Sequence, residues 1–264
     1  MTVQKNRKPV VLVMAGHDPS GGAGIQADIE TIACNGCHAI SVITCLTAQN
    51  TAEFRKSIQI DPLEFMEQVE MVLADIFIKS CKIGLITDTG ILSAIEKVLK
   101  KLKNVPVVLD PVISAGTGQK IVSKDIHLSM HDKLIPFTSI ITPNSLEARE
   151  LTGLDDLDAA GGELIKRGCK AVLITGAHEH EESKKIINTL YLKNQTIRYE
   201  WQRLPGNYHG SGCTLSSGIA ARLALGQDLQ QAAEAAQEYT WQTLRHAIRY
   251  GNNQYHPDRF YRDS

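Results

Sequence analysis

The chain has 264 residues, 43% hydrophobic residues and a formal net charge of −1. This length and apolar content suffice for one large α/β core, so we expect a single domain over residues 1–264 with an irregular tail at 251–264. The near-neutral charge excludes the basic surface of nucleic-acid-binding proteins. No segment approaches the roughly 20 apolar residues that cross a bilayer, and the six cysteines follow no disulfide framework. We therefore expect a cytoplasmic protein that acts on small molecules, without nucleic-acid or membrane partners.

Short apolar runs alternate along the chain with longer helical patterns. The first run, Val10 to Ala15, follows a basic start but leads into a glycine-rich turn, so we interpret it as a strand and not as a leader peptide. Strands that alternate with helices are typical of a parallel sheet covered on both faces. The runs 187–192 and 196–201 predict a β-hairpin at the sheet edge. The pattern predicts further strands at 39–46, 81–86, 105–109, 139–141 and 171–175, and helices at 24–33, 63–76, 90–102, 213–225 and 229–247.

Two ligand-rich clusters are better explained without a metal. Cys34 and Cys37 form a C-x-x-C, but the sequence has no second pair, and Asn35-Gly36 between them is typical of a helix end. The segment 178–182 mixes histidine and glutamate, but its spacing suits no helix-borne metal site. We expect a helix end at the first cluster and a solvated loop at the second.

Polar groups follow four of the predicted strands. These are the turn 18–24, Gln49, Asp110 and the segment 144–147. Because open α/β sheets bind ligands at the carboxyl ends of their strands, these groups should meet at one edge of the sheet. Asp110 and Glu147 are hard oxygen ligands suited to Mg²⁺, and Asn144 could orient their shell. An ordinary strand-terminal aspartate and a helix capping box explain the same residues.

The segment 209–215, HGSGCTL, precedes an alanine-rich helical run. Gly210 and Gly212 permit close backbone approach, and the first N–H groups of the helix would face an anion. Cys213 would lie at the positive end of that helix, where a thiolate is favoured, so it could accept a proton from a substrate hydroxyl while the amides hold a phosphoryl group. An inert thiol at a helix start is the structural alternative. Neither a Walker phosphate loop nor a dinucleotide-binding glycine motif is present in the sequence.

Six segments carry a family resemblance in combination, although each is weak alone. They are AGHDPSGGAGIQAD (15–28), SVITCLTAQNT (41–51), KIGLI (82–86), VLDPV (108–112), TPNSLEARELTG (142–153) and HGSGCTLSSGIAA (209–221). In this order they resemble the hydroxymethylpyrimidine and phosphomethylpyrimidine kinases of thiamine biosynthesis, within the ribokinase-like superfamily. The resemblance implies a three-layer α/β/α fold with a mostly parallel sheet and an edge hairpin. It also implies ATP- and Mg²⁺-dependent phosphorylation of 4-amino-5-hydroxymethyl-2-methylpyrimidine, of its monophosphate, or of both.

The resemblance also implies roles for individual residues. Gln49 would pair with the amino and ring-nitrogen edge of the pyrimidine, which suits a carboxamide because it both donates and accepts. Asp28 and Gly16 match other positions of the substrate pocket, although Asp28 could also be a helix surface residue. Cys213 would be the general base, provided that the helix end draws its pKa toward neutral. The amides of Gly210, Ser211 and Gly212 would hold the developing charge, with Mg²⁺ at Asp110 and Glu147.

One position departs from the family pattern. Better-known members carry a lysine before Gly-Gly-His, whereas this chain has Thr175 before Gly-Ala-His. Thr175 can still bond a nucleotide phosphate, and Asn144 is the second residue that we expect to bind the nucleotide. The departure leaves open a preference for the phosphorylated pyrimidine, or a pyrimidine-binding protein that has lost turnover. A pyridoxine or pyridoxal kinase is the nearest enzyme alternative, because its substrate ring is similar.

Two further expectations concern the surface of the protein. The glycine-rich segment Gly116–Gln119 could form a flap over the site, although a surface turn would have the same composition. Family members are commonly dimers, so we expect a homodimer, with the hairpin 187–201 as a plausible contact surface.

Overall fold

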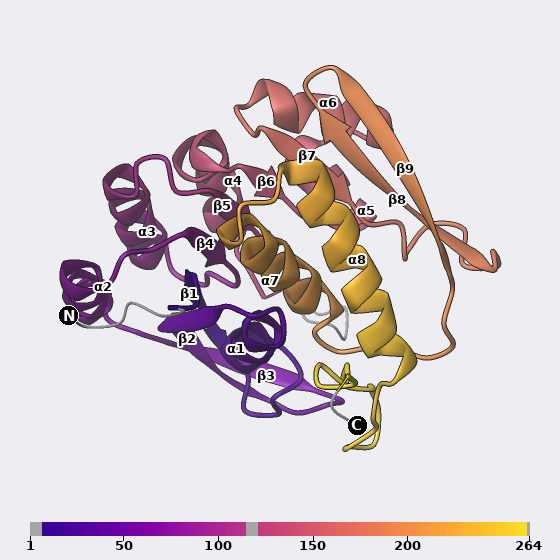
Figure 1. Ribbon diagram of the computed structural model, residues 1–264, viewed down its shortest axis with the longest axis horizontal. Helices are drawn as coiled ribbons and strands as arrows, with labels where there is room; N and C mark the ends of the chain where they lie inside the picture. The colour runs from indigo at the N-terminus through magenta and orange to yellow at the C-terminus, as the bar shows by residue number, and fades with distance from the viewer. Residues whose placement is uncertain (1–6, 115–120, 263–264) are drawn as a thin grey trace.

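A computed structural model describes residues 7–114 and 121–262. The predicted flap at Gly116–Gln119 lies outside these residues. A nine-stranded sheet runs through the molecule in the order β3-β2-β1-β4-β5-β6-β7-β8-β9 (Figure 1). The six strands from β2 to β7 pair in parallel, whereas β3, β8 and β9 are antiparallel to their neighbours. The strands are β1 (Val10–His17), β2 (His38–Gln49), β3 (Phe54–Gln59), β4 (Ser80–Ile83), β5 (Val107–Leu109), β6 (Ile140–Ile141), β7 (Ala171–Ile174), β8 (Lys185–Leu192) and β9 (Gln195–Gln202).

Helices cover both faces of this sheet, which confirms the predicted three-layer α/β/α fold. Helices α1, α7 and α8 pack on one face, and α2 to α6 pack on the other. Strand β1 illustrates the reason, because Leu12 and Met14 are buried in one core while Val11 and Val13 are buried in the other. The helices are α1 (Gly24–Cys34), α2 (Pro62–Asp75), α3 (Thr89–Lys101), α4 (Lys124–Lys133), α5 (Ser145–Thr152), α6 (Leu157–Lys166), α7 (Ser211–Ala224) and α8 (Leu229–Arg245), with a 3-10 turn at Ile135–Phe137.

Several elements differ from the prediction. Strand β4 ends at Ile83, three residues earlier than predicted, and β3 and α4 to α6 were not among the predicted elements. The segment Cys34–Cys37 ends helix α1, as predicted, with Gly36 at a φ of 82°. The edge hairpin is confirmed as β8 and β9.

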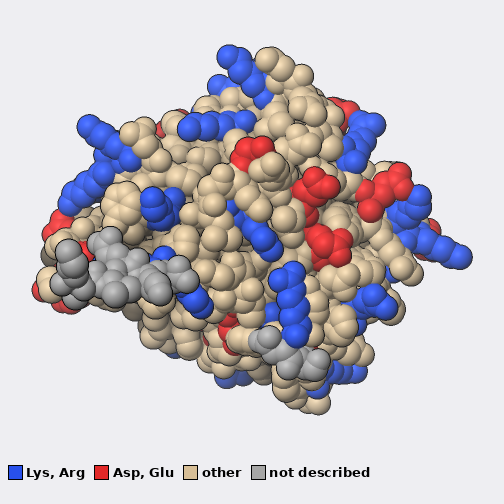
Figure 2. Space-filling view, in the orientation of Figure 1, with Lys and Arg blue, Asp and Glu red and all other residues tan. Residues whose placement is uncertain are grey.

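The order of the strands places a binding crevice near the middle of the sheet. Strand β1 lies between β2 and β4, so successive units of the chain add to opposite sides of β1. Ligands of open α/β sheets bind at such a switch point, beyond the carboxyl ends of the strands. Basic and acidic side chains are interspersed over the face shown in Figure 2. Within residues 7–114 and 121–262, no helix combines the length and apolar character needed to cross a membrane.

The tail after α8 is irregular, as predicted, but it packs back against the molecule. Backbone bridges join Ile248 to His256 and Tyr208 to Tyr255. Gln254, His256 and Arg259 are all buried. The tail therefore contributes to the core beside the start of α7.

Candidate active site

The carboxyl ends of the parallel strands and the start of α7 enclose a cavity of about 750 Å³. Small-molecule sites commonly have this size. Every predicted site residue except Asp28 lines this cavity: Gly16, Gln49, Asp110, Asn144, Glu147, Thr175, Gly210, Ser211, Gly212 and Cys213. The prediction that the polar groups after four strands meet at one edge of the sheet is confirmed for Gln49, Asp110, Asn144 and Glu147.

The start of α7 has the geometry of an anion-binding site. Gly210 precedes the helix with a φ of 82°, and no side chain caps the first turn in the described structure. A Cβ on Gly210 would lie 1.9 Å from the carbonyl oxygen of Gly22, so only glycine fits there. At Gly212 a Cβ would meet only Asp110 Oδ1, at 3.8 Å. The free amides of α7 therefore face the cavity opposite a carboxylate.

Cys213 is the third residue of α7, and its sulfur accepts a hydrogen bond from the backbone N–H of Gly24 at the start of α1. Burial raises the pKa of this thiol to about 12, although the charge of Lys82 acts in the opposite direction. The prediction that the helix end draws this pKa toward neutral is wrong for the protein without ligands. The physical reason is that desolvation of the thiolate, reinforced by Asp110 and Asp28, outweighs the nearby positive charge.

A buried charge cluster lies beneath Cys213. Lys82 Nζ is 2.9 Å from Asp28 Oδ1 and 3.6 Å from Asp110 Oδ2. Ser217 donates to Asp28 Oδ1 at 2.6 Å, and Ser216 donates to Asp110 Oδ2 at 3.2 Å. Although burial opposes the charge of Lys82, the neighbouring Asp28 and Asp110 help raise its pKa, so it stays protonated.

Asp28 therefore lies in a layer below the cavity. Its side chain is fully buried and bonded to Lys82 and Ser217, and it is absent from the described residues that line the cavity. The resemblance implies that Asp28 contacts the substrate, but in this geometry Asp28 bonds Lys82 and Ser217 instead.

Lys82 lies within the segment KIGLI, but the sequence pattern gave this residue no role. A lysine inside an otherwise apolar, buried strand is the signal that could have identified it.

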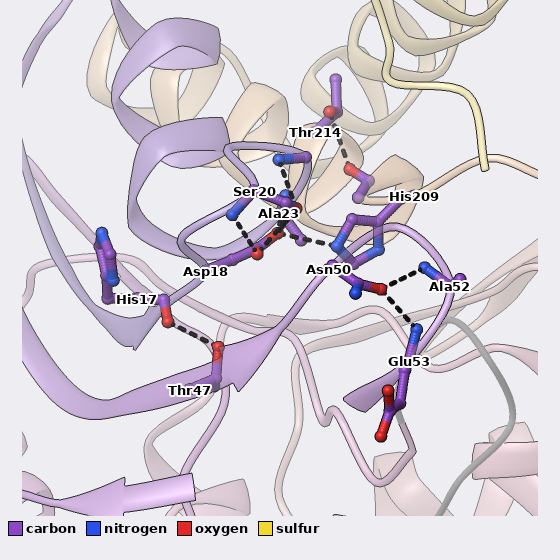
Figure 3. A network of polar contacts seen from close by, with 12 residues as sticks. His17, Asp18, Ser20, Ala23, Thr47, Asn50, Ala52, Glu53, His209 and Thr214 are labelled. Carbon is purple, nitrogen blue, oxygen red and sulfur yellow. Dashed lines mark hydrogen bonds and ion pairs between the residues drawn. The ribbon is translucent and has the colours of Figure 1, made fainter. Parts of the chain in front are cut away.

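Asp18 and His209 join the two glycine-rich loops, and sequence reasoning assigned neither a role. His209 Nε2 lies 2.7 Å from Asp18 Oδ2, and the same oxygen accepts the N–H of Ala23 at 2.9 Å (Figure 3). Although burial acts against it, the hydrogen bond from His209 lowers the pKa of Asp18. The pair fixes the turn before α1 against the turn before α7.

The end of β2 is held in place by bonds that Figure 3 also shows. Thr47 donates to the carbonyl of His17 at 3.0 Å, which ties β2 to the end of β1. Asn50 Oδ1 accepts the N–H groups of Ala52 and Glu53 at 2.8 and 2.9 Å. These contacts fix the strand end that carries Gln49 in the cavity wall.

Glu147 and Asn144 form the capping box that the sequence suggested as the structural alternative. Asn144 N donates to Glu147 Oε2, and Glu147 N donates to Asn144 Oδ1, each at 2.9 Å. Burial raises the pKa of Glu147 to about 8, and the charge of Asp110 adds to the rise. A bound cation would relieve this repulsion between two carboxylates. The described residues contain no group of three or more His, Cys, Asp and Glu side chains arranged to hold a metal.

The far end of the cavity lies beside Thr175. Asn188, Trp201 and Arg203 line this end. The guanidinium of Arg203 donates to the carbonyls of Ala177, Glu179 and Ser183 at 2.8 to 3.0 Å. The donors of this guanidinium are therefore bonded to the loop after Thr175 and do not point to a ligand in the cavity. Arg203 therefore does not take the place of the family's lysine in this structure.

Comparison with known proteins gives consistent results. The sequence model of the phosphomethylpyrimidine kinase family matches residues 18–258. The hydroxymethylpyrimidine/phosphomethylpyrimidine kinase of Synechococcus elongatus is 34% identical over 257 residues, which cover 93% of this chain and 95% of that protein. The crystal structure of phosphomethylpyrimidine kinase from Clostridium difficile superposes with a TM-score of 0.78 at 35% identity, covering 88% of this chain and 98% of that one. An ADP complex of Bacillus subtilis pyridoxal kinase gives a TM-score of 0.87 at 27% identity, covering 96% and 98%.

Proposed function

Because the chain belongs to the phosphomethylpyrimidine kinase family, we propose that it transfers the γ-phosphoryl group of ATP to 4-amino-5-hydroxymethyl-2-methylpyrimidine, to its monophosphate, or to both, in thiamine biosynthesis. One observation carries the proposal. The free amides at 210–213 face Asp110 across a cavity that also holds Gln49. An anion site opposite a carboxylate suits a phosphoryl group whose charge is shared with a divalent cation.

Catalysis in this proposal depends mainly on position and charge. Transfer of a phosphoryl group leaves little covalent work for the protein, so fixed amides aimed at the developing charge supply most of the effect. Gly210, Ser211 and Gly212 present these amides, with Cys213 as the proposed base beside them. Lys82 stays protonated and lines the cavity beside Asp110.

The remaining residues would divide between the two substrates. Gln49 would bond the pyrimidine edge beside Gly16, and Thr175 with Asn144 would bond the nucleotide. Asp110 and Glu147 would hold Mg²⁺, directly or through water, which neutralises nucleotide phosphates when bound. Two carboxylates suffice for this ion, because Mg²⁺ in kinase sites takes its other ligands from phosphates and water. A homodimer, and contact through the hairpin 187–201, stay predictions from the family resemblance.

A side-by-side assay tests this proposal. Purified protein is given ATP with hydroxymethylpyrimidine, with its monophosphate or with pyridoxal, each with and without Mg²⁺. We expect Mg²⁺-dependent formation of ADP with at least one pyrimidine, and a lower kcat/KM with pyridoxal. Turnover of pyridoxal alone would favour the alternative kinase, and tight pyrimidine binding without turnover would favour a binding protein.

A further inference from the structure

The C-terminal tail after α8 closes over the loops that form the anion site. The N–H of His209 donates to the carbonyl of Tyr255, and the N–H of Tyr255 donates to the carbonyl of Asn207, each at 2.8 Å. The N–H of Gln254 donates to the carbonyl of Thr51 at 3.4 Å, and Gln254 lines the cavity. The tail thus bonds the loop before α7 and the loop after β2.

Arg259 is the tail residue that reaches deepest. Its side chain is 2% exposed, although it carries a charge. Its guanidinium donates to the carbonyl of Gly22, to Thr214 Oγ1 at 3.1 Å and to Glu30 Oε2 at 3.0 Å. The carbonyl of Arg259 in turn accepts the hydroxyl of Tyr239 on α8 at 2.8 Å. Arg259 therefore bonds the turn before α1, helix α1 and the first turn of α7 at once.

Two of the three groups that Arg259 bonds, the Gly22 carbonyl and Thr214 Oγ1, also contact Gly210 in the anion site. The Gly22 carbonyl lies against Gly210, where it leaves no room for a side chain. Thr214 Oγ1 donates to the carbonyl of Gly210 at 2.9 Å while it accepts from Arg259. A shift of α1 against α7 would move the amide of Gly24 away from the sulfur of Cys213.

We propose that Arg259 is a positioning residue for phosphoryl transfer, which holds the turn before α1 and the start of α7 in the geometry that binds the transferring group. The inference rests on the proposed function for its substrate.

The remaining evidence for the role of Arg259 is electrostatic. A cation beside the first turn of a helix opposes the helix dipole and so lowers helix stability, yet it raises the positive potential offered to an anion. Burial of a charge with one partly exposed carboxylate partner is also costly. Both costs favour a role in anion binding over one in stability alone.

Asp18 and His209 hold the same two loops at a second point, which makes the proposal testable. Because that pair remains when Arg259 is changed, the loops should stay folded but lose their exact spacing. A displacement of about 1 Å at such a site costs about 100-fold in rate. The loss should appear in kcat, since the walls of the pyrimidine and nucleotide sites are unchanged.

The experiment compares Arg259→Ala and Arg259→Lys with Arg262→Ala, which removes the same charge from an exposed position of the same tail. For Arg259→Ala we expect kcat about 100-fold lower, with both KM values within about threefold of wild type. Millimolar guanidinium chloride should restore kcat of this variant at least tenfold, and Arg262→Ala should retain wild-type kinetics. Full kcat in both Arg259 variants, or a loss that guanidinium does not reverse, would overturn the proposal.

Two further measurements keep the test decisive. If Arg259→Ala does not fold, Arg259→Lys carries the test, because it keeps the charge but lacks the planar fork whose three nitrogens reach three separate elements. We expect its kcat to fall about tenfold, with its thermal midpoint near that of wild type.

Amide hydrogen exchange is independent of turnover, so it separates this inference from the proposed function. Exchange should rise in segments 21–26 and 207–215 of the Arg259 variants only, and unchanged exchange would contradict the positioning role.

Discussion

Cys213 lies where a general base would be needed, but its thiol is protonated at neutral pH. The thiol lies in the first turn of α7 beside the amide of Gly24, but burial raises its pKa to about 12. Below that pKa the thiolate fraction rises tenfold with each pH unit. A base of this kind is available in small amounts at neutral pH, and its supply increases as the solution becomes more alkaline.

The pH dependence of turnover tests this role. If Cys213 is the base, kcat/KM for the pyrimidine at saturating Mg²⁺, which would keep Glu147 ionised, should rise about tenfold per pH unit between pH 7 and 9 without a plateau, because the deprotonated thiol is the active form. Cys213→Ser should lower kcat by about 100-fold and flatten the profile, since general base catalysis contributes at least that factor. Its thermal midpoint and nucleotide binding should remain close to wild type. A flat profile that both proteins share would remove Cys213 from proton transfer.

At the scale of elements, the start of α7 contains two glycines with different roles, one in the fold and one in the anion site. Gly210 has a φ of 82° and contacts the carbonyl of Gly22, whereas Gly212 has open space toward Asp110. Gly210→Ala should therefore destabilise the fold by more than about 2 kcal/mol, from the left-handed backbone conformation and the steric clash together.

Gly212→Ala is the matched control, because its new methyl group meets no backbone. We expect this variant to keep its thermal midpoint within a few degrees of wild type while kcat/KM for ATP falls, since the methyl group intrudes on the anion site. Thermal unfolding and steady-state kinetics measure the two effects. Equal loss of stability in both variants would contradict this division of roles.

The elements that the sequence predicted are those with strong apolar patterns. Strand β1 and helix α3 have buried faces that the residues display directly. Helix α6 was missed because Gly161 and Gly162 lower helix propensity, yet Gly161 is required where the ring of Tyr191 packs against it. That requirement comes from strand β8, distant in sequence, so no local pattern reveals it.

The positions of site residues that belong to sequence motifs could be predicted. The properties that depend on burial in the folded protein could not. The glycine turn at 210–212 and Asp110 were placed correctly beside one cavity. The pKa of Cys213 was not predicted correctly, because it depends on how deeply the thiol is buried and on how Lys82 and Asp28 pack near it. Arg259 could not be recognised either, since an arginine in a polar tail has no periodic neighbours that would predict its burial.

At the scale of the whole molecule, the cavity joins distant parts of the sheet. Gln49 ends β2 and Thr175 follows β7, and five strand intervals separate these two strands in the sheet order. With about 4.8 Å per interval, the two ends lie about 24 Å apart across the sheet. The two residues therefore do not contact each other, and each end of the cavity can be altered separately.

Gln49→Ala and Thr175→Lys should accordingly affect different substrates. Gln49→Ala should raise KM for the pyrimidine about tenfold, from the loss of hydrogen bonds to its ring edge, with KM for ATP unchanged. Thr175→Lys should lower KM for ATP about tenfold, because it restores the phosphate-binding cation of the family, with KM for the pyrimidine unchanged. The double variant should show the sum of both effects within about 0.5 kcal/mol, since sites this far apart act independently. A change in both KM values from either single substitution would mean that the two ends of the cavity are coupled through the sheet.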